Sequence, residues 1–86
     1  MKIIWTKHAE DRQKEWEKKR GITRREIEDA LMKPEQIVAS DQGVFIAQVR
    51  REDGLLRVPF IEENEGRKVL TMYWTSKVQK YWQERQ

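Results

Sequence analysis

Residues 20–34, RGITRREIEDALMKP, hold the strongest structural signals in the chain and predict two consecutive helices. Gly21 is expected to end the first helix, because glycine tolerates the left-handed conformation common at helix C-termini. Thr23 and Glu26 form a capping box, which is typical of a helix N-terminus. Pro34 lies just beyond the end of the second helix. The apolar positions between them share one helical face: Ile27, Ala30 and Leu31.

The rest of the chain extends this pattern in both directions. A short apolar strand is predicted at Met1–Trp5, and Thr6 is a plausible N-cap for a polar first helix over Lys7–Lys19. The second helix covers Arg24–Met32. Beyond it the hydrophobic period changes from 3.6 to 2, which is typical of strands. The predicted strands and the final helix are Gln36–Ser40, Val44–Arg51, Leu55–Glu63, Arg67–Thr75 and Ser76–Gln83.

The order of these elements predicts an α+β fold in which two helices cover an antiparallel sheet of three or four strands, with a short N-terminal strand and a short C-terminal helix. The 86 residues suffice for a single domain over 1–86. Pro59 falls inside a predicted strand and cannot donate to the ladder, so we expect a bulge or a local break in pairing there.

Composition narrows the possible functions. The chain has no cysteine and a single histidine, so we expect no metal and no cofactor. No stretch approaches the ~18 apolar residues of a membrane span, and Met1–Thr6 lacks the apolar core of a secretory signal. A cytoplasmic protein without membrane association is therefore expected. The net charge of +3 is compatible with a nucleic-acid partner.

Residues 70–82 carry most of the candidate chemistry. Lys77 and Tyr81 are four residues apart, which places them on one face if the segment is helical. Lysine can stabilise the charge of a phosphorane, and tyrosine can exchange a proton if nearby cations lower its pKa. The hydroxyls of Thr75 and Ser76 can bind a phosphate or cap the last helix, and Tyr81 can equally be a packing residue.

Other basic residues are candidates for substrate binding. His8 can transfer a proton or contact a phosphate, or its ring can simply pack at the helix N-terminus. Arg12 and Arg20 can hold phosphate through a bidentate fork, or complement nearby carboxylates and the helix C-terminus. Arg57 alternates with core-type residues and so faces away from the core, either into an RNA-binding groove or into solvent.

The tryptophans are expected to have mainly structural roles. Trp5, Trp16 and Trp74 are expected at the core or its edge. Trp82 can be exposed and stack on a base, as single-stranded RNA is often held.

Several short motifs together resemble the RelE-like toxin superfamily, and more closely a small bacterial family of unknown function related to BrnT toxins. The resemblance covers almost the whole chain and rests on Thr6-Lys7-His8-Ala9 with Arg12, Lys19-Arg20-Gly21-Ile22-Thr23, Glu26-Ile27, Ala30-Leu31, Pro34-Glu35, Leu55-Leu56-Arg57-Val58, Tyr73-Trp74-Thr75-Ser76-Lys77 and Lys80-Tyr81. It implies a small metal-independent ribonuclease, commonly ribosome-dependent and held inactive by an antitoxin protein. In such enzymes the ribose 2′-hydroxyl attacks the adjacent phosphate.

Three functions are therefore open. The first is an RNase toxin acting on mRNA, with Lys77, Tyr81 and His8 as catalytic residues. This form requires His8 or Arg12 to lie close to Lys77 and Tyr81. The second is a non-catalytic RNA- or protein-binding module on the same fold. The third is an accessory subunit whose sheet edge pairs with another chain, which predicts a dimer. The corresponding partners are RNA or the ribosome, an antitoxin and a second copy of the chain.

Overall fold

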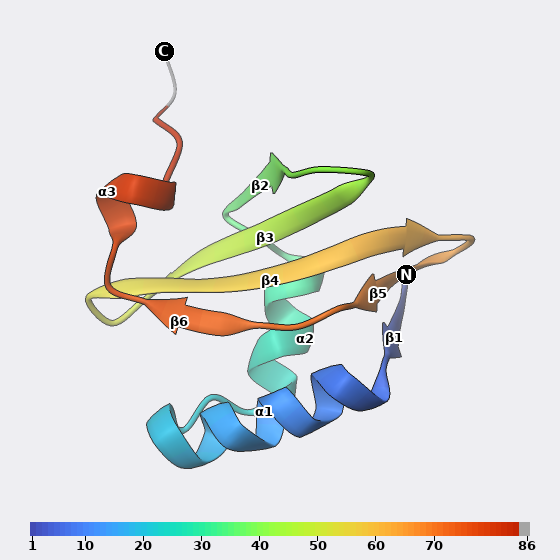
Figure 1. The fold of residues 1–86 in the computed structure, drawn as a ribbon, viewed down its shortest axis with the longest axis horizontal. Coiled ribbons are helices and arrows are strands. Elements are labelled where there is room, and N and C mark those ends of the chain that lie inside the picture. Colours follow the sequence, from blue (N-terminus) through green and yellow to red (C-terminus); the bar gives the residue numbers. More distant parts are fainter. Residues whose placement is uncertain (85–86) are drawn as a thin grey trace.

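The two predicted helices are present in the computed structural model, which describes residues 1–84 (Figure 1). Helix α1 spans Lys7–Arg20 and helix α2 spans Arg24–Met32. Thr6 Oγ1 accepts a hydrogen bond from the Ala9 amide at 3.0 Å, and Gly21 ends α1 in the left-handed region with φ 69°. The capping box at Thr23 is only half formed, because the carboxylate of Glu26 pairs with Arg51 instead.

Six strands form one mixed sheet. Its order is β1-β5-β4-β3-β2. Strands β5 and β6 share one edge of β4: β5 pairs with its second half and β6 with its first half. The strands are β1 (Lys2–Trp5), β2 (Gln36–Ala39), β3 (Val44–Arg51), β4 (Gly54–Glu63), β5 (Gly66–Val69) and β6 (Tyr73–Thr75). The predicted α+β class is confirmed. The sheet is not wholly antiparallel, because β1 and β5 run parallel.

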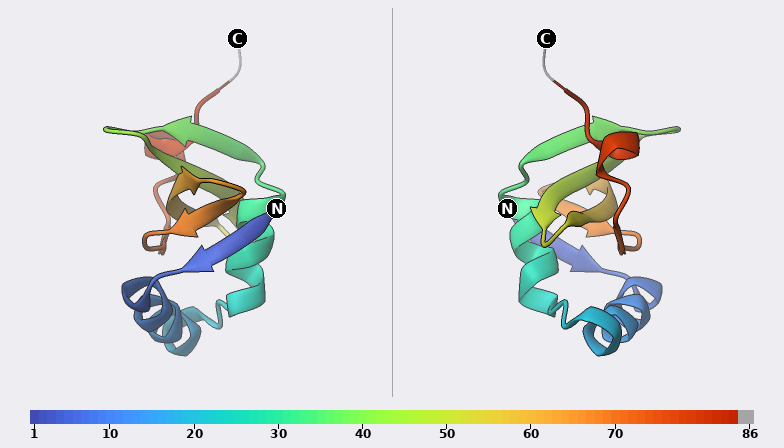
Figure 2. Two further views of the ribbon diagram at one scale, coloured as in Figure 1. Left: turned by 90° about the vertical axis from the view of Figure 1, so that its right-hand side faces the viewer. Right: turned by 90° about the vertical axis from the view of Figure 1, so that its left-hand side faces the viewer.

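Helices cover the two faces of the sheet very unequally. Helices α1 and α2 pack on one face, here called the α1/α2 face, and the short helix α3 (Val78–Tyr81) lies on the other, the α3 face (Figure 2). The core lies between the sheet and the first two helices, and it consists of Ala9, Ile22, Ile27, Ala30, Leu31, Ala47, Leu56, Val58, Phe60, Val69 and Met72. Trp5, Trp16 and Trp74 pack at its edge, as predicted.

The predicted strand over Arg67–Thr75 is interrupted opposite Pro59. The carbonyl of Pro59 accepts a hydrogen bond from the Leu70 amide at 2.9 Å. Because the N–H and C=O of one residue point to the same side of an antiparallel strand, this is also the side on which Pro59 has no N–H to donate. Pairing with β3 on the other side continues through Pro59 without a bulge. The expected break therefore occurs, and it occurs on the edge that proline leaves without a donor.

The interruption changes which side chains face each way. Phe60 pairs with Val69 and Arg57 with Tyr73, so three steps along β4 correspond to four steps along the partner segment. One extra residue in this segment reverses the alternation of the residues that follow it. As a result Tyr73 lies on the α3 face beside Arg57, whereas Trp74 packs against the core.

Several predicted boundaries differ from the structure by one residue, and that of the last helix differs by two at each end. The last helix covers only Val78–Tyr81 rather than Ser76–Gln83, since it has no side-chain N-cap and the Gln83 backbone binds the side chain of Gln36. The β3–β4 turn consists of Glu52, whose φ is 57°, and Asp53, so β4 begins at Gly54 rather than at Leu55. No helix within residues 1–84 is long and apolar enough to cross a membrane.

Candidate functional site

Arg57 is the central residue of the α3 face. It lies in the middle of β4, and the strand register places Gln48 of β3 on one side of it and Tyr73 of β6 on the other. Its predicted orientation, away from Leu56 and Val58, is confirmed, because those two residues belong to the core of the opposite face. It is not solvated, however, since α3 covers it and leaves it only 6% exposed.

Neutral groups surround the Arg57 guanidinium. Nε donates to Gln48 Oε1 at 2.5 Å, and Nη1 donates to the Tyr73 hydroxyl. The ring of Tyr81 stacks on the guanidinium, with 3.9 Å from Cζ to the ring centroid. The two tyrosine rings meet edge to face at 6.4 Å. We call Gln48, Arg57, Tyr73 and Tyr81 the arginine–tyrosine cluster.

Arg57 differs from most arginines of the chain in having no carboxylate partner. Within residues 1–84 only Arg50 and Arg57 lack one, and Arg50 stacks on Trp82 at 4.4 Å. The paired arginines are Arg12, Arg20, Arg24, Arg25, Arg51 and Arg67. A buried charge without a counterion is costly, because hydrogen bonds from neutral groups only partly replace its hydration. The site is thus electrostatically suited to an anion.

Part of the guanidinium reaches the surface. Nη2 of Arg57 makes no hydrogen bond within residues 1–84. Every buried side-chain nitrogen or oxygen of these residues does have a partner, so Nη2 cannot be a fully buried atom. Nη2 is therefore accessible to solvent. Lys77 and Lys80 are exposed residues of the segment that covers Arg57, and neither pairs with a carboxylate of residues 1–84. The α3 segment thus adds two unpaired lysines to the face on which Arg57 lies.

Glutamine side chains hold the C-terminal segment on this face. The amide of Gln36 donates to the Gln83 carbonyl at 2.7 Å and accepts from the Gln83 amide at 2.9 Å. Gln48 Nε2 donates to Gln36 Oε1 at 2.7 Å and to the Tyr81 carbonyl at 3.2 Å. These contacts compensate for the short length of α3 and fix Tyr81 over Arg57.

The predicted residues of the last segment divide between structure and surface. Tyr81 belongs to the cluster. Lys77 lies just before α3 and is exposed, so it does not share a helical face with Tyr81. Thr75 Oγ1 accepts from the Lys77 amide at 3.1 Å, which is a turn contact and not a helix cap. Ser76 is exposed beside it.

The remaining candidates lie on other parts of the molecule. His8 and Arg12 belong to α1, on the opposite side of the sheet from α3 (Figure 2), so the structure does not bring them together with Lys77 and Tyr81. His8 is exposed, and Arg12 pairs with Glu15 at 3.3 Å. Arg20 stacks on Trp74 at 3.5 Å.

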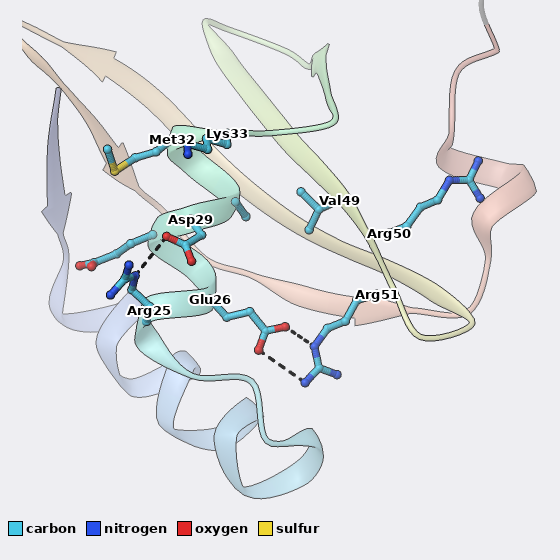
Figure 3. Close-up of a pocket in the computed structure, with 10 residues that line it drawn as sticks. Arg25, Glu26, Asp29, Met32, Lys33, Val49, Arg50 and Arg51 are labelled. Atoms are coloured by element: carbon cyan, nitrogen blue, oxygen red, sulfur yellow. Dashed lines mark hydrogen bonds and ion pairs between the residues drawn. The ribbon is translucent and has the colours of Figure 1, made fainter.

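One groove is separate from the cluster. It has a volume of about 730 Å³ and lies between α2 and β3 on the α1/α2 face (Figure 3). The Arg51–Glu26 and Arg25–Asp29 pairs line it, and the Arg50 side chain points away from it toward α3. The charges of these two pairs neutralise each other, which makes the groove a weaker candidate for an ionic ligand.

Gln48 and Tyr73 were not predicted as site residues. A glutamine between apolar residues of a strand is a signal that could have identified Gln48, because a buried amide needs a polar neighbour. Tyr73 could not be found this way, since its face depends on the extra residue opposite Pro59. No cluster of three or more metal-binding side chains occurs within residues 1–84. Comparisons of the chain with family models, curated proteins and solved structures find no match.

Proposed function

We propose that this protein binds single-stranded RNA through the arginine–tyrosine cluster. The observation that carries the proposal is the buried Arg57 guanidinium, which has no carboxylate partner within residues 1–84 and presents Nη2 at the surface. A phosphodiester would supply the missing negative charge, and arginine forms short charge-assisted hydrogen bonds with phosphate oxygens.

Aromatic and cationic neighbours support RNA over a small inorganic anion. Tyr73, Tyr81 and Trp82 lie beside Arg57 and Arg50, and bases of single-stranded RNA commonly stack on such planes. Exposed Lys77 and Lys80 would contact further phosphates. The order of elements, a strand and two helices followed by an antiparallel meander, also supports a RelE-like fold.

RNA cleavage is a second candidate, favoured by the hydrogen bond between Tyr73 and Arg57. In a metal-independent reaction the 2′-hydroxyl attacks the adjacent phosphorus and the 5′-oxygen leaves. The phenol of Tyr73 or Tyr81 would exchange protons, and Arg57 would stabilise the phosphorane. His8 and Arg12 have no part in this arrangement, because they lie across the sheet.

The binding proposal is tested with a fluorescein-labelled single-stranded RNA of about 12 nucleotides, a usual site size for small single-strand binders. Arg57→Gln should weaken binding about 10- to 100-fold, since a charge-assisted hydrogen bond is worth roughly 1.5–3 kcal/mol. Arg67→Gln is the matched control, because Arg67 is a strand arginine stacked on Phe60 but paired with Glu62. Thermal unfolding shows whether each variant is folded.

Equal affinity of folded Arg57→Gln and wild-type protein would overturn the proposal. For cleavage, expression in bacteria with and without Tyr81→Ala and Lys77→Ala reports growth and mRNA integrity. Loss of mRNA that Tyr81→Ala relieves, with 2′,3′-cyclic phosphate ends, would support the nuclease. Intact mRNA with a folded, RNA-binding wild type would leave the non-catalytic module.

A further inference from the structure

A second aromatic groove lies at the other face of the same sheet edge. It has a volume of about 700 Å³ and is lined by Trp16, Lys19, Arg20, Glu52 and Trp74. Its position follows from β6, because Tyr73 and Trp74 are consecutive residues that face opposite sides of the sheet. The groove and the arginine–tyrosine cluster therefore lie back to back at β6, which pairs with β4 along one side only.

The rings of this groove are held in place. Trp74 Nε1 donates to the Arg51 carbonyl at 3.0 Å, and Trp16 Nε1 donates to the Met72 carbonyl at 3.1 Å. Trp74 also lies directly on Gly54, where a Cβ atom would come within 2.5 Å of the ring. Ligand binding would therefore cost little ordering of these side chains.

The cations of the groove favour a nucleotide as its ligand. The Arg20 guanidinium covers Trp74 at 3.5 Å while its side chain is still 40% exposed, so its outer plane is open for stacking. Lys19 lies 5.2 Å from the Trp16 ring and has no carboxylate partner within residues 1–84. The one acid, Glu52, is neutralised by Arg20 and Arg51.

We propose that this groove is a second subsite, in which a nucleobase stacks on Arg20 and Trp16 while Lys19 contacts its phosphate. The inference rests on the proposed function: one RNA strand would pass around the β6 edge and contact both faces. The two subsites would then bind more tightly together than either does alone, because the second contact is intramolecular.

Charge reversal at two neighbouring lysines tests the subsite. Lys19→Glu should weaken binding of the labelled RNA at least about 3-fold, whereas Lys18→Glu, an identical charge change outside the groove, should weaken it less. Trp16→Leu should cost about 5- to 100-fold, the range for loss of one stacked base. Trp5→Leu is its control, because Trp5 is also a core-edge ring covered by an arginine, Arg24 at 4.3 Å.

A direct measurement separates failure of this subsite from failure of the proposed function. Titration with AMP, followed by the indole N–H signals in ¹H–¹⁵N spectra, should shift Trp16 and Trp74 while Trp5 stays in place. The shifts should persist in Arg57→Gln protein. Unmoved Trp16 and Trp74 signals, under saturating AMP and under saturating RNA, would overturn the subsite whatever Arg57→Gln does to RNA affinity. If the signals shift but Arg57→Gln leaves the affinity for RNA unchanged, the subsite is supported and the proposed site at Arg57 is overturned.

Discussion

Arg51 and Arg57 are strand arginines on opposite faces of one sheet, and their surroundings differ completely. Arg51 pairs with Glu26 of α2 and with Glu52, and it donates to the Arg20 carbonyl at 3.1 Å. Arg57 contacts only an amide, a phenol and aromatic rings. The elements that cover each face explain the contrast. Helix α2 supplies acids, whereas α3 has the sequence VQKY and supplies none.

Arg51 and Arg57 therefore have two different roles in one sheet. On the α1/α2 face the arginine is a structural cross-link between helix and strand. On the α3 face the protein keeps a desolvated cation that no carboxylate of the described residues neutralises. Such a group contributes poorly to stability, and this is the reason for proposing a ligand at Arg57.

The largest expected effect comes from damaging both faces at once. Gly54→Ala should destabilise the protein by about 3 kcal/mol, because the new Cβ atom would lie 2.2 Å from the Thr75 carbonyl and force β6 away from β4. Urea unfolding measures the loss. Gly43→Ala has open space around it and only its φ of 79° to strain it, so it should cost about 1 kcal/mol. Equal losses would show that β6 is not packed as described.

Replacing each arginine by an apolar residue should give different results on the two faces. Arg51→Met should lower the free energy of unfolding by about 2 kcal/mol, because Glu26 is left without its partner. Arg57→Met removes a costly charge and leaves only neutral partners, while Gln48 still holds the C-terminal segment, so the stability of this variant should stay within about 1 kcal/mol of wild type or rise. A loss of more than that would make the cluster chiefly structural.

Salt dependence should distinguish the free lysines of the two faces. For single-stranded RNA the slope of log K against log salt becomes less negative by about 0.7 for each phosphate contact removed. Lys77→Gln/Lys80→Gln should therefore flatten the slope by about 1.4. Lys33→Gln, at the end of α2, should leave it unchanged. An identical slope in all three proteins would exclude the α3 segment from the RNA contact.

The smallest effect is expected for exposed ion pairs of the α1/α2 side. Lys7 and Asp11 pair at 3.1 Å with side chains that are largely in solvent. Asp11→Asn should change stability by no more than about 0.5 kcal/mol in thermal unfolding. A larger loss would mean that even exposed ion pairs stabilise this protein. The ion pairs of Arg51 would then no longer stand out from the surface pairs as a structural cross-link.

Much of the fold could be predicted because its signals are local. Thr6, Gly21 and Thr23 act on amides within a few residues, and they set the ends of α1 and α2. Alternation with Leu56 and Val58 gave the correct face for Arg57. The residue pattern could not show that α3 would cover Arg57, since this depends on contacts between Gln36 and Gln83 across 47 positions.

The sequence by itself determined the α+β class, the positions of α1 and α2, the position of the strand break at Pro59 and the orientation of Arg57. Only the tertiary structure decided that Tyr73 faces Arg57, that no carboxylate of residues 1–84 reaches this guanidinium, and that His8 and Arg12 lie across the sheet. The reason is that caps and alternation act between neighbours in the chain. Strand register and helix docking instead join residues far apart, and the one extra residue opposite Pro59 is enough to exchange the faces of everything after it.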